Sequence, residues 1–222
     1  MAPLSSFAQD KSVRRVAILL ALAEQDSEAQ ARLGGLRDGL ASLGWIQGKN
    51  IAYDVKYGAG SATRMREAVR SFVSAAPDVI VVNSTPALDE AHAATRTIPV
   101  VFTLAVDPVE LGYIQSLARP GGNITGFSYW NISLIGKWLQ LLKEAAPATE
   151  RAAFIHNPAT TPFYPRLVTA AESIASRHGI QLTRIEVGEP ADIAPAIRSI
   201  AAAPNASLVI GSDPFLFQNR KT

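Results

Sequence analysis

The sequence contains no cysteine, which excludes disulfide bridges, thiolate catalysis and cysteine-ligated zinc. Long apolar runs are missing as well: none reaches the ~18 residues of a membrane-spanning helix, so we expect no stable membrane insertion. The sequence has no large excess of positive or negative charge, because 21 basic and 19 acidic residues leave a net charge of +2. Lysine and arginine do not cluster as they do in nucleic-acid-binding proteins, and the three histidines lack metal-site spacing. We therefore expect neither a nucleic-acid partner nor a metal.

Sequence motifs of common α/β enzymes are also missing. The stretch "GWIQGKN" (44–50) resembles a phosphate-binding loop only loosely, because it leads into an expected strand rather than a helix. The stretch "LGGLRDG" (33–39) lies inside a helical pattern instead of following a strand. No G-x-S-x-G nucleophile elbow occurs. We expect a protein that is not an enzyme and that needs no cofactor.

The chain does contain a repeated order of structural patterns. Its 222 residues are 48% hydrophobic and 18% charged, a globular composition that suffices for one large domain or two small ones. Apolar runs alternate with helical spacing in the order β-α-β-α-β, and this order occurs twice. The first copy comprises residues 15–22, 29–43, 51–57, 64–75 and 79–82. The second comprises residues 152–155, 165–177, 181–187, 192–202 and 208–210.

The third strand of each copy is framed in the same way. A Pro-Asp or Pro-Asn step precedes it, and "NSTP" (83–86) or "GSDP" (211–214) follows it. Strands that alternate with helices form mostly parallel sheets with helices on both faces. The sequence therefore predicts an α/β protein with two doubly wound parallel-sheet lobes.

The first copy continues further than the second. A helix at 87–95, a strand at 98–103, a helix at 109–118 and an extended stretch at 124–129 are expected, the last as the crossing between lobes. We thus assign residues 14–125 to lobe one and 126–222 to the crossing and a partial lobe two. Residues 1–13 form an N-terminal tail, in which Ser6-Phe7-Ala8 resembles the end of a secretion signal. With only three expected strands, lobe two looks incomplete, as in a truncated reading of a longer protein.

Small polar residues follow the strands of both lobes. Ligands of doubly wound sheets bind beyond the carboxyl ends of the strands, where these residues should lie. Pro86 suits a first helical position, which would make Ser84 or Thr85 the cap and leave free amides for an anion such as a carboxylate. An aspartate could hold an ammonium group, and we expect Asp213 rather than Asp107 to do so. The candidate ligand-binding residues are Asn83, Ser84, Thr85, Asp107, Asn157 and Asp213.

A purely structural interpretation of the same residues is open. Serine and threonine commonly cap helices, and both Asp-Pro steps could be caps too. His156 could simply end a polar strand, whereas His178 beside Gly179 is typical of a helix C-terminus. The occurrence of polar groups at the same place in both copies favours a ligand site between two facing lobes.

Several strings resemble one known family. The stretches "GLRDGLASLGWIQGKNIAYDVKYG", "TIPVVF", "DPV", "SLARPGGNITG" and "GKWLQLLKEAAP" are similar to the tryptophan/tyrosine-type substrate-binding proteins of ABC transporters. The likeness runs from about Arg14 to Asp213. It implies a type I periplasmic binding fold and a cleft in which Ser84, Thr85, Asp107, Asn157 and Asp213 match family positions. It also implies periplasmic or other extracytoplasmic delivery of a small ligand, with amino acids the best-supported class, to ABC permease subunits. Relative to the family, we expect the secretion signal and the C-terminal completion of lobe two to be missing from this sequence.

A ligand-sensing domain of a regulatory or signalling protein is the main alternative, because such domains share the fold. A transcription regulator of this kind would carry a DNA-binding helical unit, which we do not expect before Arg14.

Overall fold

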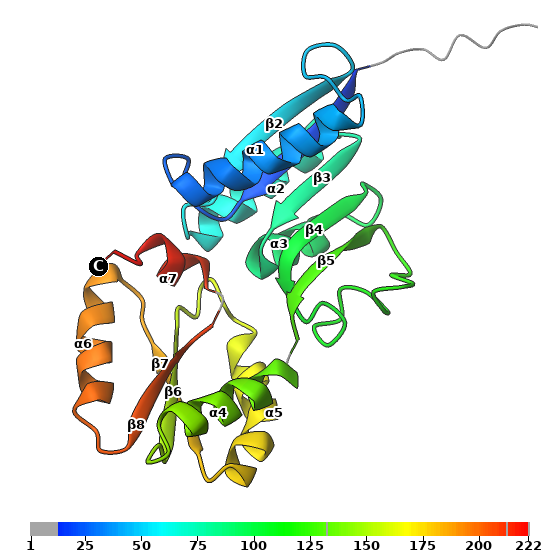
Figure 1. The fold of residues 1–222 in the computed structure, drawn as a ribbon. Coiled ribbons are helices and arrows are strands. Elements are labelled where there is room, and N and C mark those ends of the chain that lie inside the picture. The colour runs from blue at the N-terminus through cyan, green and yellow to red at the C-terminus, as the bar shows by residue number, and fades with distance from the viewer. Residues whose placement is uncertain (1–12, 132, 212, 222) are drawn as a thin grey trace, which may run out of the picture.

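The computed structural model describes residues 13–131, 133–211 and 213–221, which form two α/β lobes (Figure 1). Lobe one holds a parallel sheet of five strands in the order β2-β1-β3-β4-β5. Its elements are β1 (Arg14–Leu20), α1 (Ser27–Ser42), β2 (Ile51–Tyr57), α2 (Ala62–Ala75), β3 (Val79–Asn83), α3 (Thr85–Ala94), β4 (Val100–Val106) and β5 (Ile124–Trp130).

Lobe two holds a parallel sheet of three described strands in the order β7-β6-β8. Its elements are α4 (Ser133–Ala145), β6 (Arg151–His156), α5 (Tyr164–Arg177), β7 (Gln181–Glu186), α6 (Pro190–Ala201), β8 (Ala206–Ile210) and α7 (Pro214–Gln218). The orders β2-β1-β3 and β7-β6-β8 are equivalent, so the predicted repeat is confirmed.

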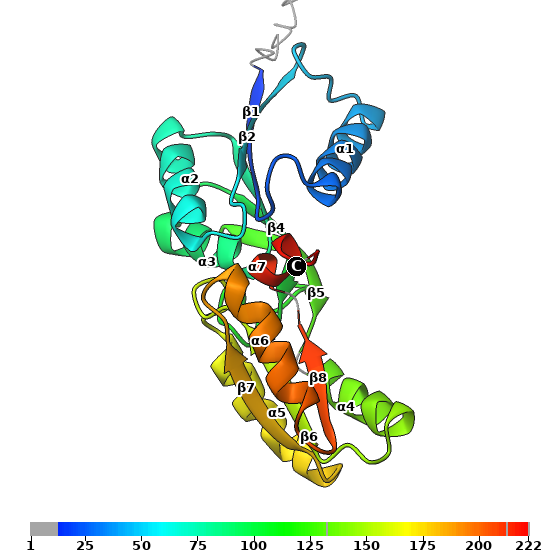
Figure 2. The same ribbon diagram turned by 90° about the vertical axis from the view of Figure 1, so that its left-hand side faces the viewer.

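Both sheets are covered on two faces, as the prediction of doubly wound lobes requires. In lobe one, α1 lies on one face of the sheet and α2 with α3 on the other (Figure 2). In lobe two, α4 and α5 cover one face and α6 the other. The continuous apolar runs of the central strands β1 and β6 follow from this burial on both sides.

Helix α2 shows how the sequence encodes these layers. Its buried residues Met65, Ala68, Val69 and Phe72 recur at helical spacing and therefore share one face. The helix begins at the Ser61 cap, which accepts a hydrogen bond from a first-turn amide, and it ends at a left-handed residue before a proline. The apolar spacing in the sequence of α2 thus matches the face that the helix buries against the sheet.

Two expectations for the end of lobe one are wrong. The stretch expected to cross between lobes is β5, which pairs with β4 and extends the first sheet to Trp130. The first lobe therefore reaches beyond the predicted boundary at residue 125. Residues 109–118 form turns instead of a helix, because the single turn after Pro108 ends at Gly112, whose φ is +81°.

Candidate ligand-binding cleft

A cavity of about 990 Å³ lies between the lobes, at the carboxyl ends of both sheets. Residues after β1, at the end of β3 and within β4 line it from lobe one, and residues that follow β8 line it from lobe two. This is the place at which doubly wound sheets bind ligands. The cavity therefore lies where a cleft was expected.

Asn83 and Ser84 line the cavity at the end of β3. Asn83 accepts a hydrogen bond from Arg32 Nη1 at 2.9 Å and donates one to Thr103 Oγ1 at 2.8 Å. Ser84 is the cap of α3, and its hydroxyl accepts from the Ala87 amide at 3.4 Å. Pro86 has no amide proton, so the start of α3 offers fewer free donors than the sequence suggested.

Thr85 and Asp107 are not among the residues that line this cavity. Thr85 is buried, and its hydroxyl accepts the Val106 amide at 2.8 Å, which ties α3 to the end of β4. Asp107 follows β4 and accepts the Glu110 amide at 3.4 Å within the turn that replaces the expected helix. Ligand binding by these two residues stays a prediction.

The backbone around the ends of β3 and β4 is strained. Ser84 has φ of +123°, Leu104 of +57° and Asp107 of +36°, values that non-glycine residues rarely adopt. Ser84 and Leu104 both line the cavity. Such strain persists where surrounding structure enforces it, and it gathers at ligand sites, which supports a functional role for this edge of lobe one.

Asp213 lines the cavity from lobe two and caps α7. Its carboxylate accepts the Asn157 amide at 2.7 Å, the Thr160 hydroxyl at 2.8 Å and the Phe215 amide at 2.8 Å. Burial raises the pKa of Asp213, against the lowering effect of these hydrogen bonds. Its carboxylate thus joins the end of β6 to α7, and a role in holding an ammonium group stays a prediction.

Asn157 lies beside Asp213 but is not among the cavity-lining residues. Its side-chain oxygen accepts the amides of Ala159 and Thr160, and its amide group donates to the Gly188 carbonyl at 3.2 Å. These bonds fix the loop after β6. Ligand contact by Asn157 stays a prediction, and Ser212, the other polar residue considered at this strand end, lies outside the described residues.

Three charged residues that the sequence did not single out also line the cavity, namely Glu28, Arg32 and Arg220. Arg32 Nε donates to Glu28 Oε1 at 3.0 Å, one helical turn away in α1. The guanidinium carbon of Arg32 lies 5.7 Å from the ring centre of Phe217 in α7. The Glu-x-x-x-Arg spacing was visible in the sequence, but it is equally typical of a solvated helix face.

Helix α7 belongs to lobe two by sequence and contacts lobe one in space (Figure 2). Gln218 Oε1 accepts the Ala23 amide at 2.8 Å, and Arg220 pairs with Asp26 at 2.7 Å. A Cβ atom on Gly60 would lie 3.2 Å from Cα of Phe215, which shows how closely the two backbones approach. This helix therefore closes one side of the cavity.

Behind the lobe-two wall lies a buried pair of aromatic side chains, His156 and Tyr164. Thr161 donates its hydroxyl proton to the Asn157 carbonyl, so it accepts from His156 Nδ1–H, which leaves His156 Nε2 unprotonated. Burial lowers the pKa of His156 and raises that of Tyr164. A Cβ atom on Gly211 would lie 2.1 Å from the Tyr164 hydroxyl, so only glycine fits this part of the cavity wall.

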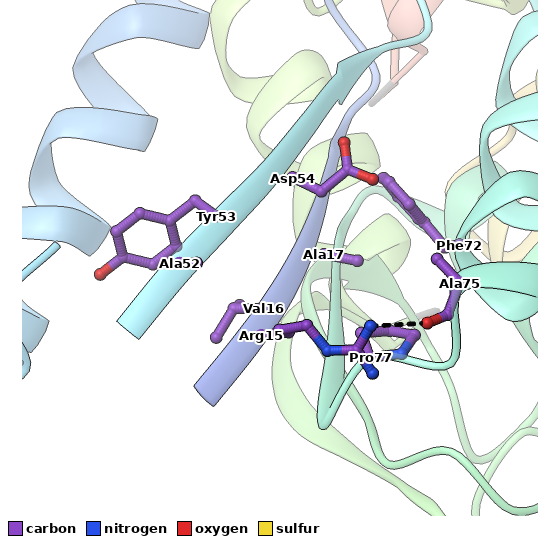
Figure 3. Close-up of a pocket in the computed structure, with 9 residues that line it drawn as sticks. All are labelled: Arg15, Val16, Ala17, Ala52, Tyr53, Asp54, Phe72, Ala75 and Pro77. Atoms are coloured by element: carbon purple, nitrogen blue, oxygen red, sulfur yellow. Dashed lines mark hydrogen bonds between the residues drawn. The ribbon is translucent and has the colours of Figure 1, made fainter. Parts of the chain in front are cut away.

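A smaller cavity of about 210 Å³ lies at the opposite end of the first sheet, between the starts of β1 and β2 and the end of α2 (Figure 3). Its lining is mostly apolar. Arg15 reaches across it and donates to the Ala75 carbonyl at 2.9 Å, which satisfies the C-terminus of α2. Of these two cavities, the cleft between the lobes therefore carries more polar residues.

The described residues contain neither a membrane-spanning helix nor a cluster of metal ligands. No helix among them combines the length and the apolar character that a bilayer span requires. No group of three or more potential metal ligands occurs among them either.

Two α/β lobes with a cleft at the carboxyl ends of both sheets define a two-lobe ligand-binding protein. The chain belongs to the ABC transporter substrate binding protein family, whose model matches residues 15–219. This is a family of binding proteins, so the expectation of a binder rather than an enzyme is confirmed, as is the resemblance found in the sequence.

A curated relative is the tyrosine-binding protein of Clostridioides difficile. It is 28% identical over 202 residues, which are 88% of this chain and 57% of the relative. The chain therefore spans little more than half the length of that protein.

Solved structures show the same type I periplasmic binding fold. A conserved domain protein from Vibrio cholerae is 32% identical, with a TM-score of 0.74, and the match covers 86% of this chain and 62% of that one. A domain from Streptococcus pneumoniae in complex with L-Trp has a TM-score of 0.79 at 20% identity and covers 95% of this chain and 69% of that one. A leucine-binding protein from Thermotoga maritima has a TM-score of 0.65 at 9% identity, with coverage of 89% and 56%.

Proposed function

We propose that this chain is the extracytoplasmic substrate-binding component of an ABC uptake transporter and that it binds an amino acid between its lobes. The cavity of about 990 Å³ at the carboxyl ends of both sheets is the observation that carries the proposal. Pockets for small molecules in proteins have volumes of roughly 300–1,000 Å³, so a single amino acid fits with room for water. The names of the relatives, which refer to tyrosine, tryptophan and leucine, support an amino acid as the ligand.

The lining of the cavity suits a ligand with a polar head and an apolar side chain. Asn83, Ser84 and Thr103 offer polar groups from lobe one, while Ile193 and Ile197 offer apolar surface from lobe two. We assign the polar head to the end of β3 and the side chain to the lobe-two wall. Ligand contact by Asn83, Ser84 and Asp213 is part of this proposal.

Titration calorimetry and thermal shift with amino acids, nucleosides and sugars test the ligand class. We expect at least one amino acid to raise the melting temperature and to bind with a stoichiometry of one. The variant Ser42→Ala, an exposed residue at the C-terminal end of α1 that does not line the cavity, serves as a control that should bind unchanged. Binding of a nucleoside or sugar, with no response to any amino acid, would contradict the proposal.

Uptake measurements test the transport role separately. Cells that lack the gene should lose high-affinity uptake of the labelled amino acid that the purified chain binds. The alternative role as a sensor predicts intact uptake together with a changed transcriptional or signalling response to that amino acid.

A further inference from the structure

The charged side chains that line the cavity differ in how many of their hydrogen-bonding groups already have partners in the protein. Asp213 is satisfied by the end of β6 and by α7, as described above. Arg220 donates to Asp26 at 2.7 Å and to the Phe217 carbonyl at 2.8 Å, and it packs over the Phe217 ring. Both residues therefore serve the contact between α7 and its surroundings, and Arg32 and Glu28 are the other charged residues that line the cavity.

Arg32 retains donors that no described residue accepts. A guanidinium group has five N–H donors, and the described part of the chain engages one on Nε and one on Nη1. Both N–H groups of Nη2 have no acceptor among the described residues. Guanidinium donors form the planar fork that binds carboxylates, and the Nη2 donors of Arg32 are open to a ligand carboxylate.

The position of this fork is fixed before any ligand arrives. Glu28 holds Nε, Asn83 holds Nη1, and the Phe217 ring lies 5.7 Å from the guanidinium carbon. The Arg32 side chain is 28% exposed, so its charge is partly withdrawn from water yet accessible from the cavity. A preorganised cation loses little side-chain entropy when a ligand binds.

Glu28 places a negative charge beside the donors of Arg32. Its carboxylate lines the same cavity and lies 3.0 Å from Arg32 Nε. A ligand that carries only a carboxylate is repelled by Glu28, whereas an α-amino acid places its ammonium group next to its carboxylate. The Arg32–Glu28 pair thus complements both charges of the ligand head.

We infer that Arg32 binds the α-carboxylate of the ligand and that Glu28 faces its α-ammonium group. This inference deepens the proposed amino-acid binding and depends on it. It moves the main anion contact from the amides of α3 to a side chain of α1, while Asn83 and Ser84 remain beside it as hydrogen-bonding neighbours.

The experiment compares one ligand with two analogues in three variants. The probes are L-tyrosine, tyramine, which lacks the carboxylate, and 3-(4-hydroxyphenyl)propionate, which lacks the ammonium group; L-tryptophan and tryptamine form a second pair. The variants are Arg32→Gln, Glu28→Gln and the control Arg37→Gln. Arg37 lies in the same helix and also packs over a ring, that of Tyr53 at 5.5 Å, but it does not line the cleft.

In the wild type, L-tyrosine should bind more tightly than tyramine by about tenfold or more, the scale of a hydrogen-bonded charge. Arg32→Gln should reduce this ratio to near one, and Arg37→Gln should leave it unchanged. Glu28→Gln should weaken L-tyrosine and should not weaken 3-(4-hydroxyphenyl)propionate. Ratios of affinities within one variant do not depend on how much of that variant is folded.

The outcomes separate this inference from the proposed function. A wild type that binds neither amino acid of the panel nor any other contradicts both. A wild type that prefers L-tyrosine to tyramine, with the same preference in Arg32→Gln, overturns the Arg32 assignment alone. An equal loss of L-tyrosine and tyramine in Arg32→Gln shows that Arg32 only supports the wall, which also overturns it.

Discussion

Ser84 holds the most unusual backbone conformation at the cleft, with φ of +123° and ψ of +162°. Only glycine adopts this region without strain, and the cost for other residues is of order 1–3 kcal/mol. The serine hydroxyl offers a weak cap in return, at 3.4 Å from the Ala87 amide. A strained polar residue that lines a cavity suggests that its side chain is retained for the ligand.

The substitution Ser84→Gly tests this trade between stability and binding. We expect the free energy of unfolding to rise by about 1 kcal/mol, because the strain is released while the loss of a cap to glycine costs only a few tenths. Affinity for the bound amino acid should fall, because one hydroxyl of the cleft is lost. Chemical denaturation and calorimetry measure the two effects, and a variant that is less stable yet binds as the wild type does would contradict both parts.

His156 predicts a dependence of stability on pH. Burial is the main cause that lowers its pKa from the ordinary 6.5, and Arg184 acts in the same direction, while Glu186 and Asp213 oppose them. Below pH 6.5 the unfolded chain therefore takes up a proton more readily than the folded one. Stability should fall as the pH drops from about 6.5 toward the lower folded pKa, and it should be fully present above pH 6.5.

Melting temperatures at pH 7.5 and 5.5 measure this effect, at roughly 2–4 °C for each kcal/mol lost in a chain of this size. The pKa of His92 is also lowered by burial and adds a loss of the same sign. The comparison is therefore between the wild type and His156→Gln, whose melting temperature should be lower at pH 7.5 but less sensitive to pH. An equal pH response in both proteins would show that His156 does not contribute.

At the scale of elements, the sequence predicted the order of most strands and helices, but it did not predict where lobe one ends. Alternating apolar runs and helical spacing sufficed for both β-α-β-α-β copies, because each pattern is local. The role of residues 124–130 was missed, since a short extended stretch reads the same whether it pairs in a sheet or crosses between lobes. Residues 109–118 were expected as a helix from their apolar spacing, and they form turns because Gly112 ends the first turn.

The site shows the same limit. Polar residues after strands could be placed at the cleft, because the carboxyl ends of parallel strands share one edge. Arg32 could not, because its contact with Asn83 joins residues 51 positions apart and depends on how α1 packs on the sheet. Hydrogen-bond partners within the walls, such as Val106 for Thr85, likewise depend on tertiary geometry that the spacing of residues does not contain.

Strand β8 should exchange its amide hydrogens faster than strand β3. β3 lies between β1 and β4, whereas β8 pairs with β6 alone among the described strands, and its Ile210 is 59% exposed. Hydrogen exchange of peptides that cover the two strands should differ by about tenfold or more, because exposed and less densely packed segments open at lower free energy.

Strand β6 provides the control for that comparison. It is central in the second sheet and buried along most of its length, so it should be protected better than β8. Equal protection of β8 and β3 would refute the edge argument. Equally weak protection of β6 and β8 would assign the difference to lobe two as a whole.

At the scale of the whole molecule, the lobes are joined by the chain after β5 and by the contacts of α7. The chain link fixes how far the lobes can separate, whereas the α7 contacts can break and form again. Arg220 pairs with Asp26, which also caps α1, and the hydrogen bond from Arg220 is the main cause that lowers the pKa of Asp26. This ion pair and the Gln218 contact therefore connect the closing of the cleft to the start of α1, because Asp26 lies two residues before Glu28 and six before Arg32.

We expect Arg220→Ala together with Gln218→Ala to favour separated lobes. The ion pair is partly exposed and each contact is worth about 1 kcal/mol or less, so the shift in the balance of conformations should be severalfold rather than complete.

Because the chain has no cysteine, Glu67→Cys in α2 and Glu172→Cys in α5, both exposed, can carry a pair of dyes that report the distance between lobes. The double variant should show a larger mean distance without amino acid and faster dissociation of the bound amino acid, and high salt should move the wild type in the same direction. Arg66→Ala, which breaks an ion pair with Glu90 inside lobe one, is the matched control and should leave both quantities unchanged. If the double variant keeps the wild-type distance and dissociation rate, α7 does not hold the lobes together, and closure depends on the ligand and the chain link alone.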